Sequence, residues 1–231
     1  TQGFAALNQK IRELGEEVRR RELAEAALVE QRNLAVFGRD VGMALAQATN
    51  LDEALGRCAE LVVEHAGAAF ARIWVAEDED LVLRASAGLY THLDGPHARI
   101  RFGQYKIGWI AEAQEPHLTN QVIGDERVHD QEWARRTGMV AFAGYPLVAE
   151  TRTMGVMAIF AQRSISPTVL AAPESVASGI AVDIQRDRIQ RDLAQHAAGL
   201  RRVDESKNEF LAMLGHAMRN PLAPIVSGLD L

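Results

Sequence analysis

Cysteine is nearly absent from the 231-residue sequence, because Cys58 is its single thiol. An internal disulfide is therefore excluded. A single cysteine is also typical of proteins from a reducing compartment, and we expect a cytoplasmic protein. The sequence also lacks any apolar run near the roughly 20 residues that cross a bilayer, and no signal peptide opens it. We therefore expect no membrane-spanning segment within these residues.

A basic block is also missing, and the net charge is −6. Neither property is typical of a nucleic-acid-binding chain, so we expect no nucleic-acid partner. Hydrophobic residues make up 48% of the sequence and charged residues 24%, which is the range of globular rather than disordered chains. The length allows one substantial domain with helical extensions.

A helical repeat of apolar residues, spaced three and four apart, occupies the start of the chain. Its members are Phe4, Leu7, Ile11, Leu14, Val18 and, after an interruption at Arg21 and Glu25, Leu28. This narrow seam, flanked by both charge signs, predicts a coiled coil over residues 1–35; the alternative is a single helix packed on its own domain. A broader stripe from Leu34 to Leu45 is suited to packing on a sheet.

Residues 36–172 alternate between helix and strand patterns and predict an α+β domain with an antiparallel sheet covered by helices. Asn50, followed by Glu53, predicts an N-cap with a capping box for a helix over about 51–65, which would bury Cys58. Strands are expected at 69–76, 81–88, 140–148 and 154–160, and short helices near 108–113 and 131–137. Residues 89–104 and 115–130 have the composition of loops. In the first strand, Phe70, Arg72 and Trp74 share one face.

A second seam follows Pro173, after which no proline interrupts the chain until Pro221. Its positions, again spaced four and three apart, are Ile189, Leu193, His196, Leu200, Val203, Lys207, Phe210, Leu214 and Ala217. This spacing predicts a long helix that pairs with a second copy as a parallel homodimer. Pro221 has no N–H to donate, so we expect the helix to kink or end there.

The end of this seam resembles the H-box of sensor histidine kinases. The matching residues are Phe210, Leu211, His216, Arg219, Asn220, Pro221 and Leu222. The resemblance implies that His216 accepts the γ-phosphate of ATP and passes it to an aspartate of a response regulator. It also implies that Asn220 places water for dephosphorylating that partner. The family usually has an acid where this chain has Ala217, so we expect slow autophosphorylation. A surface histidine on an ordinary coiled coil is the alternative.

The segment of about 36–190 resembles a GAF domain, a small sensory module, with a PAS domain as its nearest competitor. The resemblance rests on the strand 81–88, the run Ile107–Ala111 before Pro116, and Tyr145–Leu147 with Gly155 and Val156. It leaves the ligand open among cyclic nucleotides, tetrapyrroles, haem, small metabolites and no ligand. Cys58 lies outside the middle of the domain, so a covalently attached tetrapyrrole is not expected. The candidates for a haem ligand are His92, His97, His117 and His129. The tryptophans either line a pocket or fill the core, and we expect the core; these are Trp74, Trp109 and Trp133.

These patterns together predict the sensory and dimerisation part of a two-component histidine kinase. Residues 1–35 would form a coiled coil, 36–172 the GAF-like domain, and 173–231 the signalling helix and first phosphotransfer helix. The sequence ends at Leu231 without an ATP-binding domain. We therefore expect these residues to be inactive alone and ATP to act through another domain. A non-catalytic dimeric scaffold and a stand-alone ligand-binding module are the alternatives.

Overall fold

The computed structural model describes residues 2–125, 127–128, 130–165 and 167–227. The chain divides into two compact units, Thr1–Gln185 and Arg186–Leu231. The described helices are α1 (Gln2–Gln47), α2 (Leu51–Ala66), α3 (Tyr105–Ala113), α4 (Gln131–Thr137) and α5 (Pro167–Ser227). The strands are β1 (Phe70–Glu77), β2 (Asp80–Gly88), β3 (Arg99–Arg101), β4 (His117–Thr119), β5 (Ala141–Ala149) and β6 (Arg152–Ala161). This is the expected α+β fold.

All six strands form one antiparallel sheet in the order β3-β2-β1-β6-β5-β4. The two central hairpins, β1–β2 and β5–β6, lie where the sequence predicts them. The outer strands correct the prediction, because β3 and β4 occupy segments expected to be loops. Each has only three residues, which is too short to produce a recognisable alternation. Each is nevertheless paired in register: Ile100 lies opposite Leu81, and Leu118 lies opposite Ala143.

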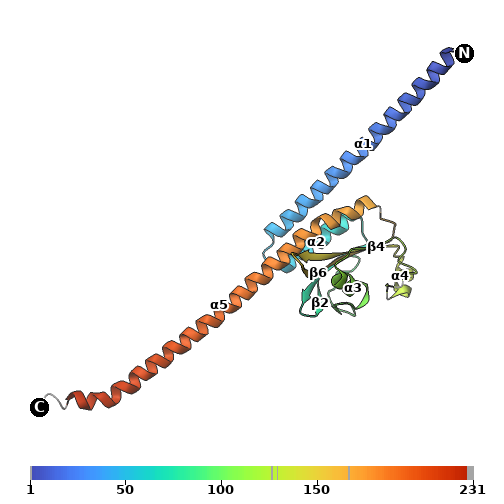
Figure 1. Cartoon of the computed structure of the whole chain (residues 1–231). Helices are drawn as coiled ribbons and strands as arrows, with labels where there is room; N and C mark the ends of the chain where they lie inside the picture. The colour runs from blue at the N-terminus through green and yellow to red at the C-terminus, as the bar shows by residue number, and fades with distance from the viewer. Residues whose placement is uncertain (1, 126, 129, 166, 228–231) are drawn as a thin grey trace. The chain divides into compact units, whose positions relative to one another are not determined.

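The sheet separates two hydrophobic cores. Strand residues alternate between them, so Ala71 and Ile73 belong to one core while Phe70 and Trp74 belong to the other, as the sequence predicts. We call the core that contains Ala71 and Ile73 the helix-side core; it joins the sheet to α1, α2 and α5 (Figure 1). The core that contains Phe70 and Trp74 joins the sheet to α3 and α4, and we call it the cavity-side core after the cavity described below. The two faces therefore carry different structures, helices on one and a loop-rich layer on the other.

Helix α2 begins with the predicted cap. The Asn50 side chain accepts a hydrogen bond from the Glu53 backbone N–H at 3.0 Å. The Glu53 carboxylate accepts bonds from the Thr49 backbone N–H at 2.8 Å and from the Thr49 hydroxyl at 2.6 Å. The glutamate thus reaches one residue beyond the cap, instead of the Asn50 N–H of a standard capping box.

Helix α1 is continuous from Gln2 to Gln47, and its C-terminal part is anchored in the first unit. Phe37 and Val41 are buried, and the Phe37 ring lies 4.9 Å from the His65 ring of α2. The broad stripe therefore packs against α2 and not mainly on the sheet. In the expected seam Leu14, Val18 and Leu28 are exposed; the side chains of Phe4, Leu7 and Ile11 lie outside the described part.

Helix α5 begins at Pro167, earlier than expected, so Pro173 lies inside it and does not mark its start. Proline is common at the first position of a helix, because the missing N–H would have no partner there. The sequence predicts a kink or an end at Pro221; the helix continues past this proline to Ser227, so it does not end there. In the described residues no helix combines the length and apolar character needed to cross a bilayer.

Candidate functional site: a cavity between the sheet and its loop layer

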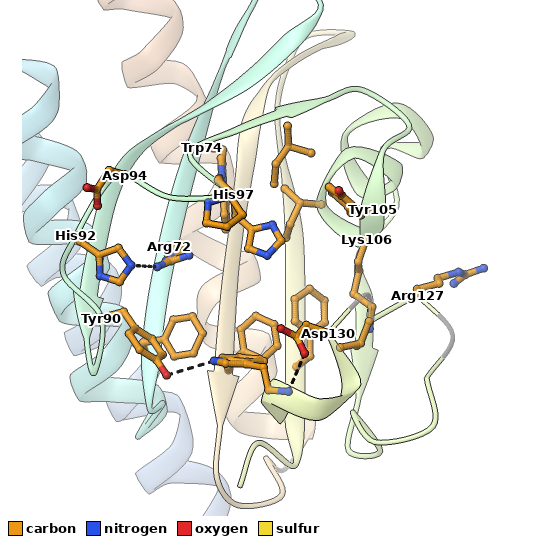
Figure 2. Close-up of a pocket in the computed structure, with 18 residues that line it drawn as sticks. Arg72, Trp74, Tyr90, His92, Asp94, His97, Tyr105, Lys106, Arg127 and Asp130 are labelled. Atoms are coloured by element: carbon orange, nitrogen blue, oxygen red, sulfur yellow. Dashed lines mark hydrogen bonds between the residues drawn. The ribbon is translucent and has the colours of Figure 1, made fainter. Parts of the chain in front are cut away.

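A cavity of about 290 Å³ lies on the sheet face opposite α2, beneath the loop 89–98 and the helices α3 and α4 (Figure 2). Strands β1, β5 and β6 supply its floor. The lining residues are Phe70, Arg72, Trp74, Tyr90, His92, Asp94, Pro96, His97, Ile100, Tyr105, Lys106, Ile107, Arg127, Val128, Asp130, Trp133, Phe142 and Phe160. Aromatic rings and cationic side chains thus line the same cavity.

The aromatic wall of the cavity follows from strand register. Phe160 of β6 lies opposite Phe70 of β1 and Phe142 of β5, so the three rings are cross-strand neighbours on one face. Phe70 stacks on Phe160 with centroids 4.9 Å apart, and Trp133 of α4 meets Phe160 edge-on at 5.3 Å. The indole N–H of Trp133 also donates to the Tyr90 hydroxyl at 3.3 Å. These contacts hold the rings in fixed relative orientations.

Arg72 is the cationic group that follows Phe70 on the same strand face. Its Nε donates to the Ser86 hydroxyl at 3.3 Å, and its Nη2 lies 3.4 Å from Nε2 of His92 (Figure 2). Because a guanidinium can only donate, the His92 nitrogen accepts this bond. The guanidinium carbon lies 5.6 Å from the Phe70 centroid and 5.8 Å from that of Tyr90. Burial lowers the pKa of Arg72, although the side chain keeps its charge at neutral pH.

The loop 89–98 is tied to the cavity floor by Trp74. Its indole N–H donates to the His97 carbonyl oxygen at 2.8 Å. On the neighbouring strand, the Ser86 hydroxyl donates to the Tyr90 carbonyl oxygen at 2.6 Å. The two bonds fix both ends of the segment that carries His92 and Asp94, so this wall of the cavity is structured.

On the opposite wall, Lys106 of α3 is buried, with 4% of its surface exposed. Its ammonium lies 2.5 Å from Oδ2 of Asp125 and 4.4 Å from the Phe142 ring centroid. His117 Nε2 lies 3.2 Å from the same carboxylate oxygen, and Arg127 Nη1 lies 3.3 Å from His117 Nδ1. The network joins α3, β4 and the loop 120–130.

The pKa shifts in this network follow from burial and hydrogen bonding. Burial lowers the pKa of Lys106, and the hydrogen bond to Asp125 offsets only part of that effect. For Asp125, burial acts to raise the pKa. The hydrogen bonds from Lys106, the Arg127 backbone N–H and His117 together outweigh it, so the pKa of Asp125 is lowered. The pair is therefore an ammonium and a carboxylate at neutral pH.

A family model for the GAF domain matches residues 48–185, which is more than half of the chain. This chain belongs to the GAF domain family. The predicted GAF module is thereby confirmed, and the PAS alternative is not. GAF domains are sensory, ligand-binding modules, and the cavity is the candidate ligand site of this one.

Solved structures with the same fold support the assignment. The GAF domain of a phosphoenolpyruvate-protein phosphotransferase from Coxiella burnetii is 21% identical with a TM-score of 0.63, covering 70% of this chain and 98% of that one. A free methionine-R-sulfoxide reductase from Neisseria meningitidis, solved with its substrate, is 16% identical with a TM-score of 0.55, covering 68% and 93%. No curated protein matches the sequence significantly. At these identities the structural likeness establishes the fold.

The tryptophans of this GAF domain divide between the two expected roles. Trp74 is a buried member of the cavity-side core, as expected, but it also lines the cavity, and so does the partly buried Trp133. Trp109 lies outside the lining, with Arg127 stacked 4.3 Å above its ring.

The histidines proposed as haem ligands also separate. His92 and His97 line the cavity, His117 binds Asp125, and His129 lies outside the described residues. Within the described residues, no three His, Cys, Asp or Glu side chains form a group that could hold a metal ion. Of the described candidates, His92 and His97 line the same cavity, whereas His117 is held by Asp125.

Cys58 lies on α2 in the helix-side core, on the other side of the sheet from the cavity. Burial raises the pKa of its thiol to about 12, with a smaller contribution from the charge of Asp183. A thiol in that state is unreactive at neutral pH, so Cys58 is a packing residue, as the sequence predicts.

The predicted phosphotransfer residues lie in the second unit. The backbone of 216 and 220 belongs to α5. The side chains of His216, Ala217 and Asn220 lie outside the part of the chain whose side chains the structure describes.

Proposed function

We propose that this chain is the sensory and dimerisation part of a two-component histidine kinase. In this proposal, the GAF domain binds a small ligand, α5 transmits the bound state, and His216 is the phosphoacceptor. The observation that carries the proposal is the continuity of α5, which begins in the GAF domain and runs as one helix through position 216. A continuous helix is a direct covalent link between a sensor and a distant residue.

The two ends of α5 support this division of roles. In the first unit Val176, Ile180 and Ile184 are buried in the helix-side core. From Ile189 onward, the large apolar side chains of the seam are exposed in the single chain. These are Ile189, Leu193, Leu200, Val203, Phe210 and Leu214. A regular apolar stripe on an exposed helix favours a second copy of the same helix as its partner. The proposed assembly is therefore a parallel homodimer.

The sheet provides the mechanical connection from the cavity to α5. On β6, Phe160 lines the cavity, while its neighbours Ile159 and Ala161 belong to the helix-side core that α5 shares. A ligand that moves the Phe160 strand changes packing on both faces, because close-packed cores transmit small displacements. In the proposed mechanism the ligand shifts the population of two packings of the α5 pair.

His216 would act as the nucleophile toward the γ-phosphate of ATP, with one imidazole nitrogen unprotonated near neutral pH. ADP would leave, and the phosphoryl group would then pass from the imidazole to an aspartate of a response regulator. Asn220 would place the water that hydrolyses that aspartyl phosphate. Ala217 cannot hold the second imidazole nitrogen or take a proton. General-base assistance is worth about 10² to 10⁴ in rate, so the proposed reaction is slow unless another group substitutes.

The same alanine favours a second candidate, a non-catalytic dimeric scaffold in which His216 is never phosphorylated. Both candidates keep the GAF ligand site and the α5 dimer, and they differ only in the chemistry at His216.

Transfer of radiolabelled phosphate from ATP to the full-length protein separates the two candidates. The kinase proposal predicts acid-labile, base-stable label that disappears in His216→Gln, and faster labelling in Ala217→Glu. The matched control is His196→Gln, which changes a second histidine of α5 and should keep the label. Equal labelling of the wild type and His216→Gln, or no label in either protein, would reject the kinase and leave the scaffold.

A further inference from the structure

The three cations that line the cavity differ in their partners. Lys106 binds the Asp125 carboxylate. Arg127 is exposed, and its guanidinium stacks on the ring of Trp109, a residue that does not line the cavity. Arg72 is half-buried, and its guanidinium contacts Ser86, His92 and the rings of Phe70 and Tyr90, all of them neutral groups. Among the described residues, no carboxylate lies within ion-pair distance of Arg72.

The two lining carboxylates do not supply the missing charge. Asp130 caps α4, where its Oδ1 accepts a hydrogen bond from the Trp133 backbone N–H at 2.7 Å. Asp94 is exposed on the loop 89–98. A partly buried cation with neutral neighbours has lost part of its hydration, which costs free energy. An anion placed beside it would offset that cost by direct electrostatic attraction. The geometry therefore favours an anionic ligand.

We propose that the cavity binds a small aromatic carboxylate, with the carboxylate on Arg72 and the ring against Phe70, Trp133 and Phe160. This inference rests on the ligand-binding half of the proposed function and not on phosphotransfer. Arg72 is the specificity-determining residue, because a planar guanidinium can pair with both oxygens of a carboxylate.

The carboxylate and the ring each follow from a separate observation. Apolar aromatic walls next to Arg72 favour a flat ring, which gains contact area and offset or edge-on ring contacts. An aromatic cage alone would also suit a quaternary ammonium ligand. Here the Arg72 guanidinium already lies over the Phe70 and Tyr90 rings, so a second cation would be repelled.

The cavity size limits the ligand to one or two fused rings. Its volume of about 290 Å³ lies at the lower limit of ligand pockets, which run from roughly 300 to 1,000 Å³. The volume therefore argues against a tetrapyrrole and against an elongated dinucleotide. Benzoate and 2-naphthoate are suitable probes of the size and chemistry that the cavity accepts.

Isothermal calorimetry with the 231-residue chain tests the inference with four probes: benzoate, 2-naphthoate, neutral benzamide and non-aromatic cyclohexanecarboxylate. We expect at least one aromatic acid to bind. Its neutral or non-aromatic counterpart should bind at least about tenfold more weakly, since a hydrogen bond to a charged group and a ring contact are each lost. Equal binding of the acid and its amide, or no heat from either aromatic acid, would overturn the assignment.

Variants locate the binding within the cavity. Arg72→Met should weaken binding of the aromatic acid at least about tenfold and leave the affinity for the amide unchanged, because only the acid pairs with the guanidinium. Arg72→Lys keeps the positive charge but loses the planar guanidinium that pairs with both carboxylate oxygens, so it should bind the aromatic acid with intermediate affinity. Arg101→Met is the matched control, since Arg101 is exposed on β3 outside the lining. Unchanged acid affinity in Arg72→Met would also reject the inference. Phosphate label on His216 plays no part in this measurement, so the two proposals fail separately.

Discussion

Lys106 Nζ lies 2.5 Å from Asp125 Oδ2, and this buried pair joins helix α3 to the loop that closes one side of the cavity. The side chains of Lys106 and Asp125 are only 5% and 14% exposed. The Phe142 ring and His117 complete the surroundings of the pair. The wall opposite Arg72 therefore depends on one ion pair whose partners are both shielded from water.

Removing one partner of this pair should destabilise the first unit strongly. Asp125→Asn leaves the Lys106 ammonium buried without a counter-charge, and we expect a loss of about 3–5 kcal/mol in the free energy of unfolding. Urea denaturation measures it. The control Glu79→Gln removes an exposed acid 3.6 Å from Arg101 and should cost less than about 1 kcal/mol. Similar losses in the two variants would show that the Lys106–Asp125 pair is not a structural tie.

The same carboxylate should make stability depend on pH in the acid range. The pKa of Asp125 is lowered below its ordinary value of 3.8, so between the two pKa values the unfolded chain binds more protons than the folded one. The Asp125 contribution is therefore complete above pH 3.8 and is lost as the pH falls through the lowered pKa. Denaturation measured from about pH 5 to about pH 3 should show that the free energy of unfolding falls more steeply for the wild type than for Asp125→Asn. Parallel curves would contradict this.

The cap of α2 gives a smaller and well-controlled effect. Asn50→Ala removes the acceptor for the Glu53 N–H and should lower the free energy of unfolding by about 1 kcal/mol. Asn50→Ser is the matched control, because serine caps helices about as well as asparagine. Thermal unfolding of the wild type, Asn50→Ser and Asn50→Ala measures their order of stability, and the alanine variant should be the least stable. If the alanine and serine variants melt together, the Asn50 side chain does not act as the cap.

Two glycine substitutions should have opposite signs. A Cβ on Gly155 of β6 would lie 2.1 Å from the Trp74 carbonyl oxygen on β1, and backbone cannot move aside as a flexible side chain can. Gly155→Ala should therefore cost about 1–3 kcal/mol of unfolding free energy. Gly199 lies in α5, and apart from the adjoining helix backbone no described atom lies within 4 Å of the Cβ that alanine would add. Gly199→Ala should therefore increase helical stability by about 0.5–1 kcal/mol.

Denaturation of the first unit measures the effect of Gly155→Ala, and the helical content of α5 on heating measures that of Gly199→Ala. Unchanged stability of Gly155→Ala would contradict the close approach of β6 to β1, and a destabilised Gly199→Ala would contradict the open surroundings of Gly199.

The sequence predicted the elements that carry a long periodic signal. Local pattern predicts the two hairpins and α2 with its Asn50 cap. It also predicts that Phe70 and Ala71 of β1 point to opposite faces of the sheet. The short strands β3 and β4 could not be predicted in this way. Three residues carry no period, and their pairing depends on strands that are distant in the sequence.

The candidate site was predicted less completely than the fold. Arg72 between Phe70 and Trp74 was a usable signal, because a charged residue on the inward face of a half-buried strand needs a reason. Lys106 and Asp125 gave no such signal. Their pairing requires α3 and the loop 120–130 to come together, and nothing local in either segment specifies that contact.

The dimer seam is the central claim, and disulfide cross-linking of single-cysteine variants tests it most directly. In a Cys58→Ala background, Leu193→Cys lies on the exposed seam of α5, whereas Ala198→Cys lies on the opposite helix face. A parallel dimer places the two copies of position 193 side by side, so we predict rapid cross-linking of Leu193→Cys and little of Ala198→Cys. Equal rates at the two positions, or a chain that stays monomeric, would contradict the account.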